Sequence, residues 1–147
     1  MPGMTASIVV ARPVEEVFAF LLNPKESAPR IDPGGGLVLM SPEGTPGPGT
    51  TFVFRQRVMG RTAETKTHLT AVEPNRRIEF DAKIGPMRPR CSLTFESVAE
   101  GTLVTFRGDS SPPRPLKVFT PAMDRMGQKN WARRLSRVKD VLESTGP

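Results

Sequence analysis

The chain contains one histidine, His68, and one cysteine, Cys91, and these are the first side chains to test for chemistry. A site of the nucleophile and base type needs an imidazole beside the thiol. The alternation of apolar and polar residues places His68 on the outer face of a predicted strand and turns Cys91 inward, on the opposite side of the sheet. We expect a solvated His68 and a Cys91 that acts as a small buried apolar residue, so no catalytic residue is assigned.

The same residue counts limit metal and cofactor chemistry. A single cysteine excludes multi-cysteine metal motifs and an internal disulfide, and a single histidine excludes sites that need two imidazoles. The glycine run Gly34 to Gly36 is followed neither by a helix nor by the lysine of a phosphate-binding loop. We expect no metal and no cofactor.

Gln56 is the one long polar side chain that the alternation turns inward, next to Thr65 and Thr67. An amide there can hydrogen-bond a ligand carbonyl, but it cannot exchange protons near neutral pH. The alternative is a buried amide whose partners are neighbouring backbone groups. The carboxylates of Glu79, Asp81 and Glu96 in the following strands fall on the wet face, and a register slip of one residue would reverse all of these assignments.

One helix, a series of strands and a long final helix must position these side chains. Strands are expected at 7–10, 37–40, 51–58, 62–73, 77–83, 90–98 and around 104–106, with helices between Arg12 and Pro24 and at 121–143, and one more short turn at 25–31. Pro24 ends the first helix. Proline and glycine concentrate between Pro33 and Gly49, which predicts a mobile loop at about 33–49 that carries the 37–40 strand.

This order of elements predicts an α+β fold, with a curved antiparallel sheet of about seven strands wrapped around the C-terminal helix. The inner face mixes large phenylalanines with Ala63, Thr65, Thr67 and Ala71, which leaves either an interlocked core or a void. An apolar void with few polar groups is the usual form of a small-molecule pocket. The candidate ligand-binding residues are Phe18, Phe52, Phe54, Gln56, Thr65, Thr67, Leu69, Phe80, Leu93, Phe95, Phe106, Met123, Met126 and Trp131. Met123 and Met126 are expected to form the roof, with ordinary core packing as the alternative.

The basic charge is concentrated at the end of the chain. The net charge of +6 divides into +1 for residues 1–113 and +5 for residues 114–147. The outer face of the last helix is expected to hold Arg125, Lys129, Arg133, Arg134, Arg137 and Lys139. A solvated helix face is the simplest explanation, and an anionic surface or nucleic acid bound through Arg133, Arg134 and Arg137 is the alternative. Because exposed aromatic residues do not alternate with these arginines, no nucleic acid is expected.

Length and composition set the remaining expectations. A chain of 147 residues fits a single domain, 1–147, and 37% hydrophobic residues without a long apolar run predict no integral membrane contact. Residues 1–7 lack the features of an export signal, so we expect a cytoplasmic protein, either a monomer or a homodimer.

Several segments together resemble a known superfamily. They are residues 8–18, 49–52, 72–78, 93–95 and 101–105, beginning with Ile-Val-Val-Ala-Arg-Pro-Val-Glu-Glu-Val-Phe. In order and spacing the chain resembles START-like (SRPBCC) proteins of the polyketide cyclase/dehydrase group, although Ile31 stands where relatives often carry tryptophan. The resemblance implies the helix-grip fold and the binding of a hydrophobic, aromatic or lipid-like molecule between the sheet and the C-terminal helix. Since some relatives catalyse aromatic ring closure, a cyclase or dehydratase activity is the alternative.

Overall fold

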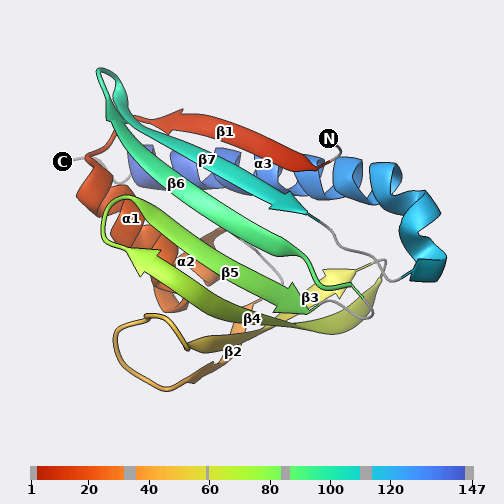
Figure 1. Ribbon diagram of the computed structural model, residues 1–147. Coiled ribbons are helices and arrows are strands. Elements are labelled where there is room, and N and C mark those ends of the chain that lie inside the picture. Colours follow the sequence, from red (N-terminus) through yellow and green to blue (C-terminus); the bar gives the residue numbers. More distant parts are fainter. Residues whose placement is uncertain (1–2, 32–35, 59, 84–86, 110–113, 145–147) are drawn as a thin grey trace.

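A computed structural model describes residues 3–31, 36–58, 60–83, 87–109 and 114–144, without the side chains at positions 29 and 56–58. The strands are β1 (Met4–Val10), β2 (Gly36–Ser41), β3 (Thr51–Val58), β4 (Arg61–Glu73), β5 (Arg77–Lys83), β6 (Arg90–Val98) and β7 (Gly101–Asp109). The helices are α1 (Val14–Leu22), α2 (Pro24–Ile31) and α3 (Thr120–Ser144), with a 3₁₀ segment η1 (Arg114–Phe119) before α3. This is the predicted α+β fold of a curved antiparallel sheet and a long C-terminal helix (Figure 1).

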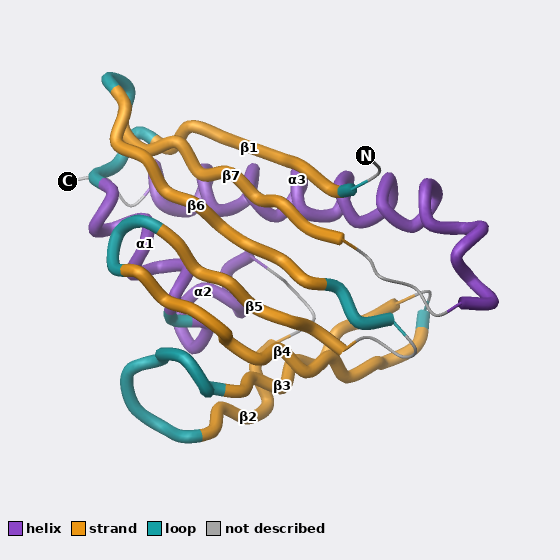
Figure 2. Tube along the Cα trace, in the orientation of Figure 1, coloured by secondary structure: helices purple, strands orange, loops and turns teal. Residues whose placement is uncertain are grey.

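The seven strands form one sheet in the order β1-β7-β6-β5-β4-β3-β2, with antiparallel pairing throughout. All three helices cover one face of the sheet, with α3 behind β1 and β7 and with α1 and α2 behind the middle strands (Figures 1 and 2). Apolar residues on the inner face of the strands, mostly at alternate positions, face these helices and form the core. The helices and the inner face of the sheet therefore enclose a shared interior.

The pairing of β4 with β5 contains one irregularity that changes the predicted faces. Leu69 pairs with Phe80, whereas Ala71 pairs with Glu79 and Val72 pairs with Ile78. The extra residue in β4 reverses the alternation after Leu69, as β-bulges do. Val72 therefore packs against the core, and the prediction that Ala71 shares the inner face is wrong.

Local signals account for the first two helices. Pro13 precedes α1, Glu15 and Glu16 lie in its first turn, and the Asn23 amide donates to the Ala19 carbonyl at its end. Pro24 does end this helix, but it also begins α2, which is a full helix of eight residues where the sequence indicated only a short turn. Proline fits there because the first turn of a helix needs no amide hydrogen from it.

The C-terminal end of α3 is attached to the end of β1 by a group of polar contacts. Glu143 accepts hydrogen bonds from the Ala11 amide at 2.8 Å and from Lys139 Nζ at 2.6 Å, and these donors lower the pKa of its carboxyl group. Arg12 Nε donates to the Leu142 carbonyl at 2.9 Å, and Thr102 Oγ1 donates to the Arg12 carbonyl at 2.8 Å. These contacts fix the helix over the sheet.

The opposite end of α3 extends past the start of β1, where no strand covers it (Figure 1). Val118 of η1, which precedes this end, is 76% exposed, and Met126 of α3 is 74% exposed. Farther along, Leu135, Val138 and Leu142 are buried against the sheet. No helix within the described residues is long and apolar enough to cross a bilayer.

Candidate functional site

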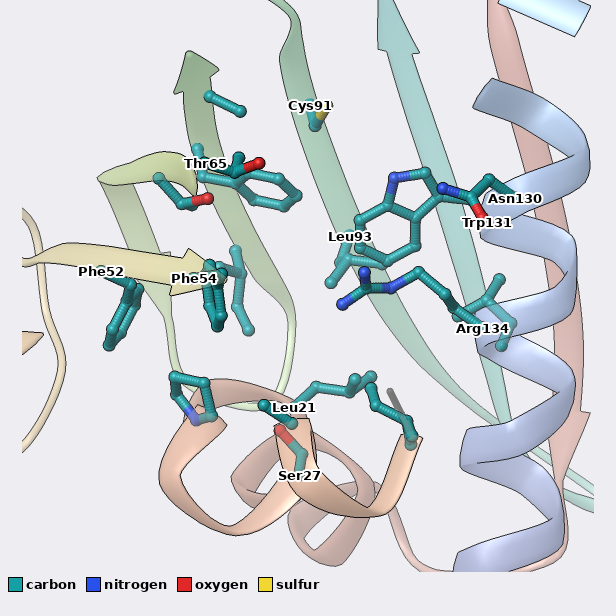
Figure 3. A pocket seen from close by; sticks show the side chains of 18 of the residues that line it. Leu21, Ser27, Phe52, Phe54, Thr65, Cys91, Leu93, Asn130, Trp131 and Arg134 are labelled. Carbon is teal, nitrogen blue, oxygen red and sulfur yellow. The ribbon is translucent and has the colours of Figure 1, made fainter. Parts of the chain in front are cut away.

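A cavity of about 220 Å³ lies between the inner face of the sheet, α2 and α3. Its walls are mostly apolar. The sheet contributes Met4, Phe52, Phe54, Leu69, Ile78, Phe80, Ala82, Cys91 and Leu93, the segment before β6 contributes Pro89, and the helices contribute Leu21, Leu22, Pro24, Ala28, Ile31, Gly127, Trp131, Leu135 and Val138. Since α3 packs near the β1 edge of the sheet, the space lies over the central strands β3 to β6 (Figure 3).

Small side chains create this space at the centre of the sheet. Thr67 of β4 and Ala82 of β5 are paired across neighbouring strands, and both line the cavity. Phe80 and Phe52 stand beside them as large neighbours. The combination of large and small residues seen in the sequence therefore leaves a void rather than an interlocked core.

A few polar groups lie within this apolar lining. They are Ser27 from α2, Thr65 and Thr67 from β4, and Asn130 and Arg134 from α3. Arg134 is the only charged side chain among the described lining residues. An apolar pocket with a few placed polar groups is the form that small-molecule sites take.

Trp131 organises the α3 side of the cavity. Its indole stacks on Phe106 with ring centroids 4.3 Å apart and planes 10° from parallel, and Phe80 lies 6.0 Å away. The guanidinium carbon of Arg134 lies 4.8 Å from the indole centroid. Because Phe106 occupies one face of the indole, the guanidinium covers the other face.

The structure brings most of the candidate residues from the central strands together at this cavity. Phe52, Phe54, Thr65, Thr67, Leu69, Phe80, Leu93 and Trp131 all line it. Three other candidates lie in the solid core instead: Phe18 packs edge-on against Phe95 at 5.2 Å, and Phe106 is fully buried under Trp131. The prediction that these three line the pocket is corrected, because Phe18 of α1 packs directly on Phe95 of β6 and Trp131 of α3 covers Phe106 of β7. The side chain of Gln56 lies outside the described part of the structure.

The predicted methionine roof is wrong. Met126 is 74% exposed, and Met123, which is half-buried, does not line the cavity. At about 100° per residue, Met126 lies roughly 140° around the helix from Trp131, on the side away from the sheet. The apolar residues Phe119, Met123 and Met126 therefore do not form one continuous stripe with Trp131, Leu135 and Val138, which pack against the sheet.

Arg134 corrects the predicted basic face of α3. It lies only about 60° around the helix from Trp131, so it belongs to the inward stripe rather than to the outer face. Arg137 also reaches inward and donates to the Ile31 carbonyl of α2 at 3.0 Å. Only Arg133 of the three nominated arginines remains on the exposed face, which weakens the case for an anionic surface there.

His68 and Cys91 lie on opposite sides of the sheet, as the alternation predicted. His68 is exposed, with its Nδ1 3.1 Å from the Thr51 hydroxyl, whereas Cys91 is buried and lines the cavity. Burial, together with the nearby carboxylates of Asp81 and Asp109, raises the pKa of the Cys91 thiol to about 12. The thiol is therefore protonated near neutral pH and is a poor nucleophile. Within the described ranges, no three histidine, cysteine, aspartate or glutamate side chains form a metal-binding group.

Sequence reasoning missed several lining residues. Met4 was outside the predicted first strand, although the alternation of Met4, Ala6, Ile8 and Val10 continues back to it. Ser27 was missed because α2 was expected to be only a turn. A helical-wheel analysis centred on Trp131, Leu135 and Val138 would have found Arg134.

The sheet, the long helix and the cavity between them define a helix-grip protein. The family described as polyketide cyclase / dehydrase and lipid transport matches residues 1–143, and the chain belongs to this family. No curated protein matches the sequence.

Solved structures agree with this fold. Protein TTHA0849 from Thermus thermophilus superposes with a TM-score of 0.77 at 15% identity, over 99% of this chain and 100% of that one. Protein Ms6760 from Mycobacterium smegmatis superposes with a TM-score of 0.76 at 16% identity, over 98% of this chain and 92% of that one. DynU16, a protein from the dynemicin biosynthetic locus, superposes with a TM-score of 0.68 at 22% identity, and this chain spans 49% of its length. At these identities the similarity shows the fold.

Proposed function

We propose that residues 1–147 act as one domain that binds a small hydrophobic or aromatic molecule in the cavity between the sheet and α3. The observation that carries this proposal is the void of about 220 Å³ with phenylalanine, leucine and isoleucine walls. An unfilled apolar void forgoes the dispersion contacts of its lining, so a complementary ligand would gain them. The family description, which includes lipid transport, supports the same class of function.

Binding has more support than catalysis. Among the described lining residues there is no carboxylate and no imidazole, and the lining thiol has its pKa raised to about 12. General acid–base catalysis near neutral pH needs a group whose pKa lies near the working pH. The cyclase or dehydratase alternative therefore lacks a described proton carrier in this cavity.

Co-purified molecules and a reporter dye test the proposal directly. Native mass spectrometry of the purified protein should detect a bound small molecule that is released on denaturation. The neutral dye N-phenyl-1-naphthylamine should show saturable fluorescence enhancement that hydrophobic competitors reverse. The absence of saturable uptake across diverse hydrophobic compounds would overturn the proposed function.

A matched pair of variants locates the binding. Thr67→Phe places a ring in the cavity, whereas Thr62→Phe adds the same ring at an exposed position of the same strand. We expect Thr67→Phe to abolish dye uptake and Thr62→Phe to retain it. Equal dye affinity in the two variants would place the binding elsewhere.

A further inference from the structure

We propose that η1 and the first turns of α3 dock on an anionic membrane surface. The docking surface, which we call the η1–α3 patch, consists of exposed basic and apolar side chains: Arg114, Lys117, Val118, Phe119, Arg125, Met126 and Lys129. It differs from the set of arginines expected from the sequence, because Arg134 and Arg137 reach inward. The inference concerns the outside of the molecule, so it goes beyond the proposed function and does not require a ligand in the cavity.

The η1–α3 patch exposes three large apolar side chains. Val118 is 76% exposed, Phe119 is 53% exposed and Met126 is 74% exposed. They are three of the five large hydrophobic residues that are exposed in the described part of the chain, and the other two lie in β2. Exposed apolar side chains that are concentrated in one segment and surrounded by polar residues indicate a contact surface.

The position of β1 leaves this part of α3 uncovered. The Thr5 amide, near the start of β1, donates to Gln128 Oε1 at 3.0 Å. The turns of α3 that precede Gly127 therefore extend past the start of β1, and η1 lies beyond them at the same end of the molecule (Figure 1). Because this end protrudes, a broad surface such as a bilayer can reach it.

The charge around the apolar side chains of the patch is positive. From Arg114 to Lys139 the sequence contains eight basic residues and one acidic residue, Asp124, which is only 4% exposed. The charged side chains that are classed as exposed in this stretch are therefore all basic. Each lysine or arginine beside an anionic bilayer strengthens the attraction about fivefold, so the basic residues of the patch together favour such a bilayer strongly.

An anionic bilayer fits the patch better than a second copy of the chain or a nucleic acid does. In a symmetric dimer the same surface of both copies meets, so the basic side chains would face one another. Nucleic-acid bases stack on aromatic rings, and of the three exposed apolar side chains only Phe119 is aromatic. At a bilayer surface, apolar side chains enter the boundary of the acyl chains while lysines and arginines contact anionic headgroups.

Co-sedimentation with vesicles of two compositions tests the docking. Vesicles of phosphatidylcholine alone are neutral, whereas vesicles with about 30% phosphatidylserine are anionic. At about 50 mM salt we expect the wild-type protein to bind the anionic vesicles at least about tenfold more tightly than the neutral ones. At about 500 mM salt most of this preference should be lost, because the charges are screened. Equal binding to both compositions, or binding to neither, would overturn the inference.

A matched pair of charge variants locates the docking surface. The double variant Lys117→Gln with Arg125→Gln removes two charges from the patch. The control, Lys66→Gln with Lys83→Gln, removes two charges from exposed positions that are paired on neighbouring strands of the sheet. We expect the patch variant to bind anionic vesicles at least about tenfold more weakly than the wild type and the control to stay within about threefold. Equal weakening in both variants would show that only net charge matters and would overturn the inference.

A second pair tests the apolar part of the patch at constant charge. Phe119→Gln with Met126→Gln removes two of its exposed apolar side chains, and Val38→Gln with Leu39→Gln does the same in β2. We expect the patch variant to bind anionic vesicles at least about fivefold more weakly and the β2 variant to bind as the wild type does. Unchanged binding by the patch variant would overturn the insertion of these side chains. The charge pair still decides the docking if an apolar variant does not fold.

Two measurements test the other occupants of the patch. Light scattering should find a monomer, and a dimer that Phe119→Gln with Met126→Gln separates would assign the patch to self-association and overturn the inference. Anionic vesicles should remain bound when a DNA duplex with an equal concentration of phosphate is added, and their full displacement would assign the patch to nucleic acid. Dye uptake by the cavity is measured separately, so a failure of docking leaves the proposed function standing.

Discussion

Cys91 illustrates how the environment of a residue decides its chemistry. It is the one thiol of the chain and it faces the candidate ligand cavity, which is where a nucleophile would be useful. Burial and the carboxylates of Asp81 and Asp109 instead raise its pKa from 9.0 to about 12. At this site the thiol acts as part of an apolar wall.

The raised pKa of Cys91 predicts a loss of stability at high pH. Since the folded-state pKa of about 12 lies above the ordinary value of 9.0, the unfolded chain releases its proton first as pH rises through 9. The resulting contribution is complete below pH 9 and is lost at about 1.4 kcal/mol per pH unit above it. Urea unfolding of the wild type and Cys91→Ala from pH 7 to pH 10.5 measures this difference. If the free energy of unfolding changes with pH in the same way in both proteins, the folded state does not raise the pKa of the thiol, and the prediction is wrong.

At the level of elements, the turn between β6 and β7 packs tightly on the end of β1. Gly101 has a φ of 139°, and a Cβ placed there would clash with the Val10 carbonyl oxygen. Gly101→Ala should therefore destabilise the fold by at least about 1–3 kcal/mol, through strain and displacement of β1. The control Gly36→Ala lies in β2, where a Cβ meets nothing within 4 Å, and should change stability by less than about 0.5 kcal/mol. Denaturant midpoints at pH 7 compare the two variants, and similar midpoints would contradict the close approach.

The elements also show what the sequence could predict. Alternation located the central strands and the inward direction of Phe52, Phe80 and Leu93, because a residue buried on one face leaves a period of two. It could not locate the bulge after Leu69, since nothing local marks the extra residue that moves Val72 inward. On α3, hydrophobicity alone assigns the exposed Met126 to the inward stripe, because it does not show which side of the helix faces the sheet.

The same limit applies to the candidate site. The sequence places Arg134 in solvent because arginines are mostly exposed. Its inward position depends on Trp131 and on the distance between α3 and the central strands, which is a property of the assembled fold. The inward threonines Thr65 and Thr67 follow from strand alternation, whereas a charged helix residue that lines a cavity does not follow from the sequence pattern.

At the scale of the whole molecule, α3 packs on the sheet at its β1 edge and α2 packs on the same face near the β2 edge, so the centre of the interior stays open. A protein selected only for stability would fill that space with larger side chains on the central strands. The pairing of Thr67 with Ala82 in the middle of the sheet keeps the space open, at a cost in packing.

Filling the cavity should therefore stabilise the protein while it removes binding. Thr67→Phe, already expected to block dye uptake, should raise the free energy of unfolding by about 0.5–2 kcal/mol, because cavity-filling substitutions add contacts without changing the fold. Thr62→Phe, at its exposed position, should leave stability within about 0.5 kcal/mol of the wild type. Urea unfolding of ligand-free protein measures both variants. A Thr67→Phe protein that is less stable than the wild type would mean that the space over the central strands cannot admit a ring, and that a ligand of that size cannot enter it either.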